Sequence, residues 1–317
     1  MKKALVLGAS GGMGYSIVKE LSSRGIAVTA FARTKSKLEK LFDVDSNVTI
    51  FSGDIFELDD LLAASAGVDV IFQSANLPYV EWEEKLALFM TNVLNVAKSQ
   101  SAKFAFVENI YAYGRSPGKR VTETTPKNPH TKKGNIRLQV EKLVEESGVP
   151  ALIAHFPDFY GPNAESTILH YTLQNIVKNK KSSYVGDQKI AREFIYTPDG
   201  AKAIVNLALN EEAYGQSWNI PGYDVITGEE LILMIRNITQ YDKKVSTISK
   251  NMIKLLGLIN ANMREVVEMF YLNEEPVVLD GEKYEKEIGP VPRTSYEEGL
   301  RKTIEYMIDR EKEKGIG

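Results

Sequence analysis

Cysteine is absent from the 317 residues, and histidine occurs only three times, as His130, His155 and His170. The absence of cysteine excludes disulfides, thiolate metal sites and a cysteine nucleophile, and it is typical of proteins from a reducing compartment. No two histidines stand at a metal-ligand spacing such as HExxH, so we expect no metal centre.

Long apolar runs are also missing. No stretch of about 18 or more apolar residues could form a membrane span, and the apolar start of the chain breaks into glycines too early for a signal peptide. The net charge of −3 gives no general reason to expect nucleic acid or an anionic membrane as a partner. We therefore expect a cytoplasmic protein that binds neither.

What the sequence does contain, over its first half, is an alternation of short apolar runs and helical patterns. Near-continuous apolar strands separated by helices are typical of a parallel sheet covered on both faces. Right-handed crossovers then give a doubly wound α/β fold, a Rossmann fold, which binds ligands at the carboxyl ends of its strands. The expected strands are residues 4–9, 27–33, 48–55, 68–75, 103–110 and 150–156, and the expected helices are residues 13–24, 81–99 and 138–147.

After Pro157 the strict alternation stops, and the remaining elements predict a smaller second part. One of its helices is expected to begin after the cap Thr227. We expect a dinucleotide-binding domain of residues 1–160, completed by a segment at about 192–210 that returns to the main sheet, and a substrate-binding cap of residues 161–191 and 211–317. The elements expected here are strands 192–197 and 217–222 and helices 199–210, 227–240 and 295–314.

A glycine-rich turn stands between the first expected strand and the first expected helix. Glycines let a phosphate approach the backbone closely, and the free N–H groups at a helix start bind it. In this position, after a buried strand and before a helix, the pattern predicts a dinucleotide site. The turn comprises Gly8, Ser10, Gly11, Gly12, Met13 and Gly14.

The second expected strand ends where a dinucleotide fold contacts the adenosine ribose. A residue that binds the ribose 2′-hydroxyl of NAD at this position would be Asp or Glu. This chain instead has Arg33, Thr34 and Lys35, followed by Lys37. Cationic and hydroxyl groups suit a 2′-phosphate, so we predict NADP rather than NAD. Asp54, at the end of the third strand, either accepts the adenine amino group or caps the following helix.

With motifs further along the chain, these residues resemble the extended short-chain dehydrogenase/reductases, also called the NAD-dependent epimerase/dehydratase family. The spacing GxxGxxG at the glycine turn is one such motif. The likeness covers nearly the whole chain. The other segments that carry it are QSAN (73–76), TNVLNVA (91–97), FVENIYAYG (106–114), VTETTPKNP (121–129), HFPDFYGP (155–162), REFIYTPDGAKAI (192–204) and SYEEGLRKTIEYM (295–307).

The resemblance implies further contacts to a cofactor and a substrate. In many relatives the slots held here by Asp158 and Arg192 serve nucleotide-sugar binding, and Tyr113 lies in a segment that lines the cleft. Arg192 could anchor an anion bidentately, whereas an ionised Asp158 would repel a diphosphate. The implied cofactor residues beyond the glycine turn are Ile55, Ser74, Ala75, Asn76, Asn92, Phe156 and Pro157.

The departures from the family lie in its catalytic residues. Asn109 stands where the family keeps Ser or Thr, Lys133 takes the tyrosine slot, and Arg137 takes the lysine slot four residues later. Arg137 could still bind ribose hydroxyls, and Asn109 could still donate a hydrogen bond.

The missing phenol leaves the proton donor open. Lys133 is one candidate, since burial beside Arg137 would favour a neutral amine and so a more acidic ammonium. Tyr111, Tyr113 and Tyr160 are the other candidates, because all three lie in segments that line the family's cleft.

Three functions follow from these patterns. The preferred hypothesis is an atypical NADP-dependent reductase of a small-molecule carbonyl or activated alkene. The first alternative is an NADP(H)-binding regulatory protein without catalysis, like the NmrA-like relatives. The second alternative is a nucleotide-sugar epimerase or dehydratase. Helices 81–99 and 137–147 could form a homodimer interface.

Overall fold

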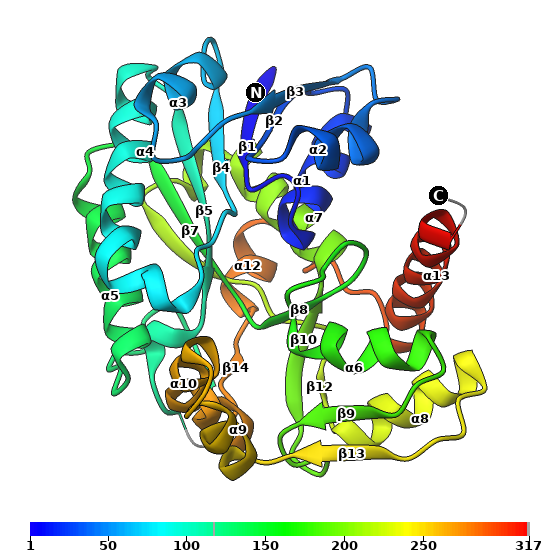
Figure 1. Ribbon diagram of the computed structural model, residues 1–317. Helices are drawn as coiled ribbons and strands as arrows, with labels where there is room; N and C mark the ends of the chain where they lie inside the picture. Colours follow the sequence, from blue (N-terminus) through cyan, green and yellow to red (C-terminus); the bar gives the residue numbers. More distant parts are fainter. Residues whose placement is uncertain (117, 316–317) are drawn as a thin grey trace.

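The structure, a computed structural model, describes residues 1–116 and 118–315, and its main element is a sheet of seven parallel strands (Figure 1). The strand order is β11-β7-β5-β4-β1-β2-β3, so the predicted doubly wound parallel sheet is confirmed. The strands are β1 (Lys3–Leu7), β2 (Ala27–Ala32), β3 (Val48–Ser52), β4 (Val70–Gln73), β5 (Lys103–Asn109), β7 (Ala151–Phe156) and β11 (Gln216–Asn219).

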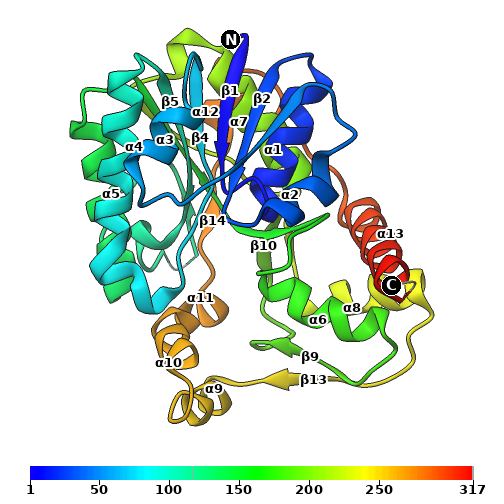
Figure 2. The ribbon, with the colours of Figure 1, turned by 45° about the horizontal axis from the view of Figure 1, so that its top comes forward.

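Helices cover both faces of this sheet because the strands are apolar on both sides (Figures 1 and 2). In β1, Leu5 and Leu7 pack into one core, whereas Ala4 and Val6 pack into the other. The first core lies under α3 (Leu58–Ala64), α4 (Ala87–Ser99) and α5 (Lys132–Glu146), and the second lies under α1 (Gly12–Ser23), α2 (Lys35–Phe42), α7 (Thr197–Leu209) and α12 (Glu282–Glu287).

The segment 192–210 returns to the main sheet only in part, through its helix α7, which covers one face of that sheet. Its helix α7 packs against α1, but its strand β10 (Arg192–Tyr196) pairs with β8 (Asp158–Tyr160) and β12 (Val225–Ile226) in a separate sheet. The seventh strand of the main sheet is β11, which the sequence placed in the cap. Strand partners are set by hydrogen bonds between distant segments, which a local apolar pattern does not encode. The division into a dinucleotide-binding domain and a cap stays a proposal, with β11 moved to the former.

The second part of the molecule surrounds the small sheet and has an apolar core of its own. Thr227 caps α8 through a capping box with Glu230, so the predicted cap at this residue is confirmed. In the described part of the chain, none of the helices combines the length and apolar character needed to span a membrane. The elements here are α6 (Ile168–Val177), α8 (Gly228–Thr239), α13 (Tyr296–Gly315) and the parallel pair β9 (Ser182–Val185) and β13 (Val245–Ile248).

A third segment, residues 249–279, connects the two parts and packs against the start of α5 (Figure 1). It contains α9 (Lys250–Leu256), α10 (Ala261–Val267), η5 (Glu268–Phe270), α11 (Tyr271–Glu274) and β14 (Val278–Leu279), which pairs with β6 (Arg120–Val121). The expected helix 81–99 is in fact three pieces, η1 (Tyr79–Glu81), a π-helical turn η2 (Trp82–Leu86) and α4. The remaining short helices are η3 (Tyr111–Tyr113) and η4 (Glu211–Ala213).

Candidate functional site

The glycine turn joins β1 to α1 and lies against the loop that follows β4. Gly8 has a φ of +79°, which glycine adopts readily, and a Cβ there would lie 2.6 Å from the backbone of Ala75. A Cβ at Gly14 would lie 2.2 Å from the carbonyl oxygen of Gly8, but one at Gly11 would have no neighbour closer than 3.4 Å. The turn is therefore closed towards the sheet and open at Gly11.

The start of α1 has the properties of an anion site. Gly11 is its N-cap, and the N–H groups of Gly12, Met13 and Gly14 have no carbonyl partner inside the helix. The first turn has the sequence GMGY, which contains no carboxylate to oppose the positive end of the helix dipole. These residues fit the pyrophosphate of a dinucleotide.

A loop of the second part covers this turn, a feature that the sequence analysis missed. Asn163 donates a hydrogen bond from Nδ2 to the carbonyl of Ser10 over 3.0 Å, and a Cβ at Gly12 would lie 2.6 Å from Cα of Ala164. The Tyr306 hydroxyl of α13 lies 3.4 Å from Oδ1 of Asn163. The carboxyl-terminal helix is thereby linked to the predicted phosphate site.

The residues predicted to contact the adenosine end lie after β2 and β3. Arg33 and Thr34 are exposed, and Thr34 is the N-cap residue of α2 without a side-chain hydrogen bond. Asp54 accepts a hydrogen bond from the Phe56 N–H over 3.0 Å within the loop, but it does not cap α3, whose N-cap is Glu57. Ile55 is buried beside it. Within the described residues, Arg33 makes no ion pair.

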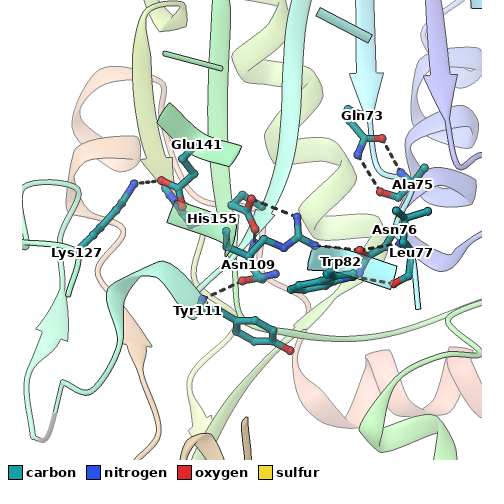
Figure 3. Close-up of polar contacts among 12 residues, drawn as sticks. Gln73, Ala75, Asn76, Leu77, Trp82, Asn109, Tyr111, Lys127, Glu141 and His155 are labelled. Atoms are coloured by element: carbon teal, nitrogen blue, oxygen red, sulfur yellow. Dashed lines mark hydrogen bonds and ion pairs between the residues drawn. The ribbon is translucent and has the colours of Figure 1, made fainter. Parts of the chain in front are cut away.

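The loop after β4 forms the next part of the site (Figure 3). The Ser74 hydroxyl donates to the carbonyl of Leu7 over 2.7 Å, and the Gln73 side chain bonds both backbone groups of Ala75 at 2.8 Å. These bonds fix the loop between the glycine turn and Asn76. The other predicted cofactor residues are the half-buried Asn92 on α4 and the buried Phe156 and Pro157 at the end of β7.

Lys133, in the tyrosine slot, lies at the start of α5 and is only 1 % exposed. Its Nζ forms a close ion pair with Glu265 and lies 3.4 Å from Oε1 of Glu268. Glu268 also accepts the backbone N–H groups of Lys132 and Lys133. The sequence analysis suggested Arg137 as the charged neighbour of Lys133, but in the structure its ion-pair partners are the carboxylates of Glu265 and Glu268.

Arg137, in the lysine slot, is buried one turn further along α5. It donates from Nη1 to Glu108 over 3.3 Å and from Nη2 to Asn76 over 3.1 Å, and its guanidinium lies 4.2 Å from the ring centroid of Trp82 (Figure 3). Burial raises the pKa of the Glu108 carboxyl, and the positive charge of Arg137 opposes that rise only in part. Arg137, which the sequence analysis expected to bind the cofactor ribose, thus donates its hydrogen bonds to Glu108 and Asn76.

Asn109 and Tyr111 follow at the end of β5, between the Lys127–Glu141–His155 group and the loop after β4 (Figure 3). Oδ1 of Asn109 accepts the N–H of Tyr111 over 2.9 Å. The Tyr111 hydroxyl lies 2.6 Å from that of Tyr79. Burial, together with Tyr79, raises the pKa of Tyr111 well above its usual value, so this phenol keeps its proton.

Tyr113 lies on the side of β5 opposite to Tyr111, and there it belongs to a buried polar group that the sequence analysis did not predict. Its hydroxyl donates to Asn219 over 2.8 Å, and burial raises its pKa. Behind it, Glu141 lies 3.2 Å from Nε2 of His155 and forms a close ion pair with Lys127. Burial alone would raise the pKa of Glu141, but these two partners hold it below its ordinary value.

Asp158 and Arg192, both predicted to contact substrate, form a close ion pair across β8 and β10. Arg192 is 4 % exposed and donates its other nitrogen to Oδ1 of Asn273. The pair lines a small cavity that Ile110 and Leu272 also border. Arg192 is therefore not a free cation, and Asp158 is not a free carboxylate.

The structure thus gathers several predicted residues at the ends of the adjacent strands β1, β4 and β5. It adds Glu108, Glu265 and Glu268, which the sequence analysis did not single out. Glu108 precedes the family's serine slot, and its position beside Asn109 could have drawn attention to it. Glu265 and Glu268 lie more than a hundred residues from Lys133, and no local pattern connects them.

Comparison with known families gives a match over residues 4–220 to the profile described as "NAD dependent epimerase/dehydratase family". Among curated proteins, the chain is 23 % identical over 333 residues to UDP-N-acetyl-alpha-D-glucosaminuronate decarboxylase of Bacillus cytotoxicus, covering 98 % of this chain and 99 % of that protein. It is 24 % identical over 257 residues to human dTDP-D-glucose 4,6-dehydratase, covering 77 % of this chain and 66 % of that enzyme.

Solved structures share the fold at low sequence identity. The dTDP-glucose 4,6-dehydratase of Bacillus anthracis in complex with NAD superposes with a TM-score of 0.81 at 18 % identity, covering 98 % of each chain. The UDP-glucose 4-epimerase of Thermotoga maritima with UDP-glucose has a TM-score of 0.79 at 20 % identity, covering 97 % of this chain and 99 % of that one. The predicted fold class is confirmed.

Proposed function

Because the chain belongs to the NAD-dependent epimerase/dehydratase family, we propose that it is a nicotinamide dinucleotide-dependent enzyme that acts on a nucleotide sugar. The relatives support this class, since the decarboxylase, the dehydratases and the epimerase are named for UDP- or dTDP-linked sugars. They support the nucleotide-sugar alternative better than the small-molecule reductase that the sequence favoured.

The observation that carries this proposal is the ion pair between Asp158 and Arg192. The sequence argued against a nucleotide sugar because an ionised Asp158 would repel a diphosphate. In the folded protein Arg192 neutralises that charge, so the objection no longer applies. The substrate diphosphate would then meet a paired, polar surface bordered by Asn273.

The cofactor would be held at the glycine turn, with its pyrophosphate at the N–H groups of Gly12 and Met13. Bound there, the nicotinamide supplies a hydride acceptor or donor. We further propose a preference for NADP, supported by the exposed Arg33 directly after β2 and by the absence of Asp or Glu at that strand end.

We assign proton donation to Tyr111. Lys133 is bound to two carboxylates, and Tyr113 donates to Asn219 on the other side of β5. Tyr160 packs in the core of the second part. Tyr111 instead stands beside the serine-slot residue Asn109, and its hydroxyl lies 2.6 Å from that of Tyr79. Burial raises its pKa and makes it a weak acid, so it would donate its proton only to a strongly basic substrate oxygen, such as the alkoxide that hydride transfer to a carbonyl produces.

The test begins with calorimetry of the purified protein against NAD and NADP. We expect NADP to bind more tightly, and Arg33→Ala to lower NADP affinity about tenfold while leaving NAD affinity unchanged. A panel of UDP- and dTDP-hexoses is then screened by thermal shift, and the sugars that stabilise the protein are incubated and analysed for altered products. Tyr111→Phe should lower turnover about a hundredfold. If no nucleotide sugar stabilises the protein, this function is refuted.

A second candidate is a dinucleotide-binding protein without turnover. It is favoured by the ion pairs of Lys133 with Glu265 and of Arg137 with Glu108. Both residues at the family's catalytic tyrosine and lysine positions are thus engaged by carboxylates of the protein itself. This candidate predicts dinucleotide binding by calorimetry but unchanged sugars after incubation, and no effect of Tyr111→Phe. The same experiments therefore separate the two functions.

A further inference from the structure

The segment from residue 243 to residue 264 differs in charge from the rest of the chain. The whole protein has 42 acidic and 39 basic residues, yet this stretch of 22 residues contains no carboxylate. Its sequence, KKVSTISKNMIKLLGLINANMR, carries Lys243, Lys244, Lys250, Lys254 and Arg264. One of these charges is partly compensated, because Lys250 lies 3.0 Å from Glu274. The local excess of positive charge is therefore opposite in sign to the net charge of the protein.

The same segment exposes a cluster of large apolar side chains, which we call the apolar tip. It lies at the end of α9 and in the turn to α10. Isolated exposed apolar residues are common, but a contiguous exposed group marks an interaction surface. The members and their exposed fractions are Met252 50 %, Leu255 68 %, Leu256 46 %, Leu258 73 % and Ile259 88 %.

The apolar tip is held in shape by the hairpin that α9 and α10 form. A Cβ at Gly257 would lie 3.1 Å from Cα of Arg264, and Arg264 donates from Nε to the Gly257 carbonyl over 3.1 Å. Asn260 caps α10 by accepting the Met263 N–H, and Ile253 is buried on the inner side. Since the hairpin is already ordered, docking of its tip would cost little conformational entropy.

The hairpin is also well placed to reach a surface. In Figures 1 and 2 it lies at the end of the molecule opposite the amino terminus, with α9 outermost. Glu265 of α10 and Glu268, at the start of the following η5, bind Lys133. These two carboxylates thus bind the rest of the protein, whereas Lys254 and the apolar tip are exposed.

We propose that this hairpin docks the protein on the surface of an anionic lipid bilayer, with the apolar tip entering the headgroup region and the hairpin's own cations, Lys250, Lys254 and Arg264, binding lipid phosphates. Exposed apolar residues flanked by cations are the pattern of interfacial membrane elements. A second copy of this chain is a poorer partner, because a two-fold contact through the tip would bring the same cations together. The docking is independent of the proposed enzymatic function.

The test is co-sedimentation of the full-length protein with vesicles of phosphatidylcholine alone or mixed with phosphatidylglycerol. We expect binding to the anionic vesicles that weakens as salt is raised. Leu258→Glu/Ile259→Glu should lower the partition coefficient at least about tenfold, and Lys254→Glu should lower it at least about fivefold. The matched control is Val44→Glu/Leu233→Glu, which changes two exposed apolar residues outside the hairpin and should bind like the wild type.

Unfolding temperatures of all variants are measured in parallel, and the three substitution sites in the hairpin are exposed, so each variant should fold. The proposal is overturned if the wild type does not bind anionic vesicles, or if the control and tip variants lose binding equally. It is also overturned if size-exclusion chromatography with light scattering shows a dimer that the tip variant converts to a monomer, since the tip would then bind a second copy.

Discussion

At the scale of single residues, Lys133 and its two carboxylate partners differ in their access to water. Lys133 is 1 % exposed, whereas the side chains of Glu265 and Glu268 are each 28 % exposed. A charge in contact with water tolerates the loss of its partner, but a buried charge does not. The two sides of this ion-pair group should therefore respond differently to mutation.

We expect Glu265→Gln/Glu268→Gln to lower the free energy of unfolding by about 3 kcal/mol, because it leaves a buried ammonium without a counter-charge. Lys133→Met should cost only about 1 kcal/mol, since both carboxylates can be hydrated. Urea denaturation at pH 7 measures both changes. The exposed Lys254→Met is the control and should have almost no effect. Equal losses in the two ion-pair variants would show that Lys133 is not the buried member of the group.

At the scale of elements, the glycine turn and the start of α1 determine whether a dinucleotide can bind. The turn contains positions of two kinds. At Gly8 and Gly14 a side chain would collide with protein backbone, so substitution there tests folding. At Gly11 the φ is −92° and a Cβ has room in the protein, so substitution there tests the space left for a ligand.

Gly11→Ala should therefore leave the unfolding temperature within about 2 °C of the wild type, yet lower dinucleotide affinity at least about tenfold. The added methyl group would stand where a phosphate approaches the helix N–H groups. Calorimetry with NAD and NADP and thermal unfolding provide the two readouts. Ser23→Ala, at the other end of α1, is the control. Unchanged affinity in Gly11→Ala would place the pyrophosphate elsewhere.

At the scale of the whole molecule, Glu193 connects the small sheet to the end of the 249–279 segment. This buried carboxyl on β10 accepts the N–H of Leu279 over 3.0 Å and that of Gly222 over 3.2 Å. Burial raises the pKa of Glu193 to about 7, although these two hydrogen bonds and the charges of Arg120 and Arg293 oppose the rise.

Because the pKa of Glu193 is higher in the folded protein than in the unfolded chain, its contribution to stability is fully present below the unfolded pKa. That contribution is lost as pH rises towards 7, where the buried carboxyl must give up its proton. We expect Glu193 to contribute about 3 kcal/mol of pH dependence between pH 4.5 and pH 7, with the protein less stable at the upper end. Glu193→Gln should remove this slope in urea denaturation measured across the interval. The exposed Glu229→Gln is the control. If the pH dependence of the free energy of unfolding remains in Glu193→Gln, it arises from other groups, such as Glu108.

The arrangement of the whole molecule also leaves one sequence prediction open. A homodimer through helices 81–99 and 137–147 stays a prediction, and light scattering of the protein at several concentrations would test it. The net charge of −3 gave no reason to expect a membrane partner, because it averages over the chain. The local charge of residues 243–264 leads to the opposite proposal for one surface.

The sequence by itself determined the parallel doubly wound sheet, the glycine turn before the first helix and the identity of the residues in the catalytic slots. These features are local, since they depend on apolar periodicity, on glycine conformations and on spacing within single segments. Only the tertiary structure decided that β11 and not β10 completes the main sheet, that Asp158 and Arg192 neutralise each other, and that Glu265 and Glu268 hold Lys133. Each of these depends on partners distant in the chain, and the strength of a charge depends on the neighbours and the burial that folding gives it.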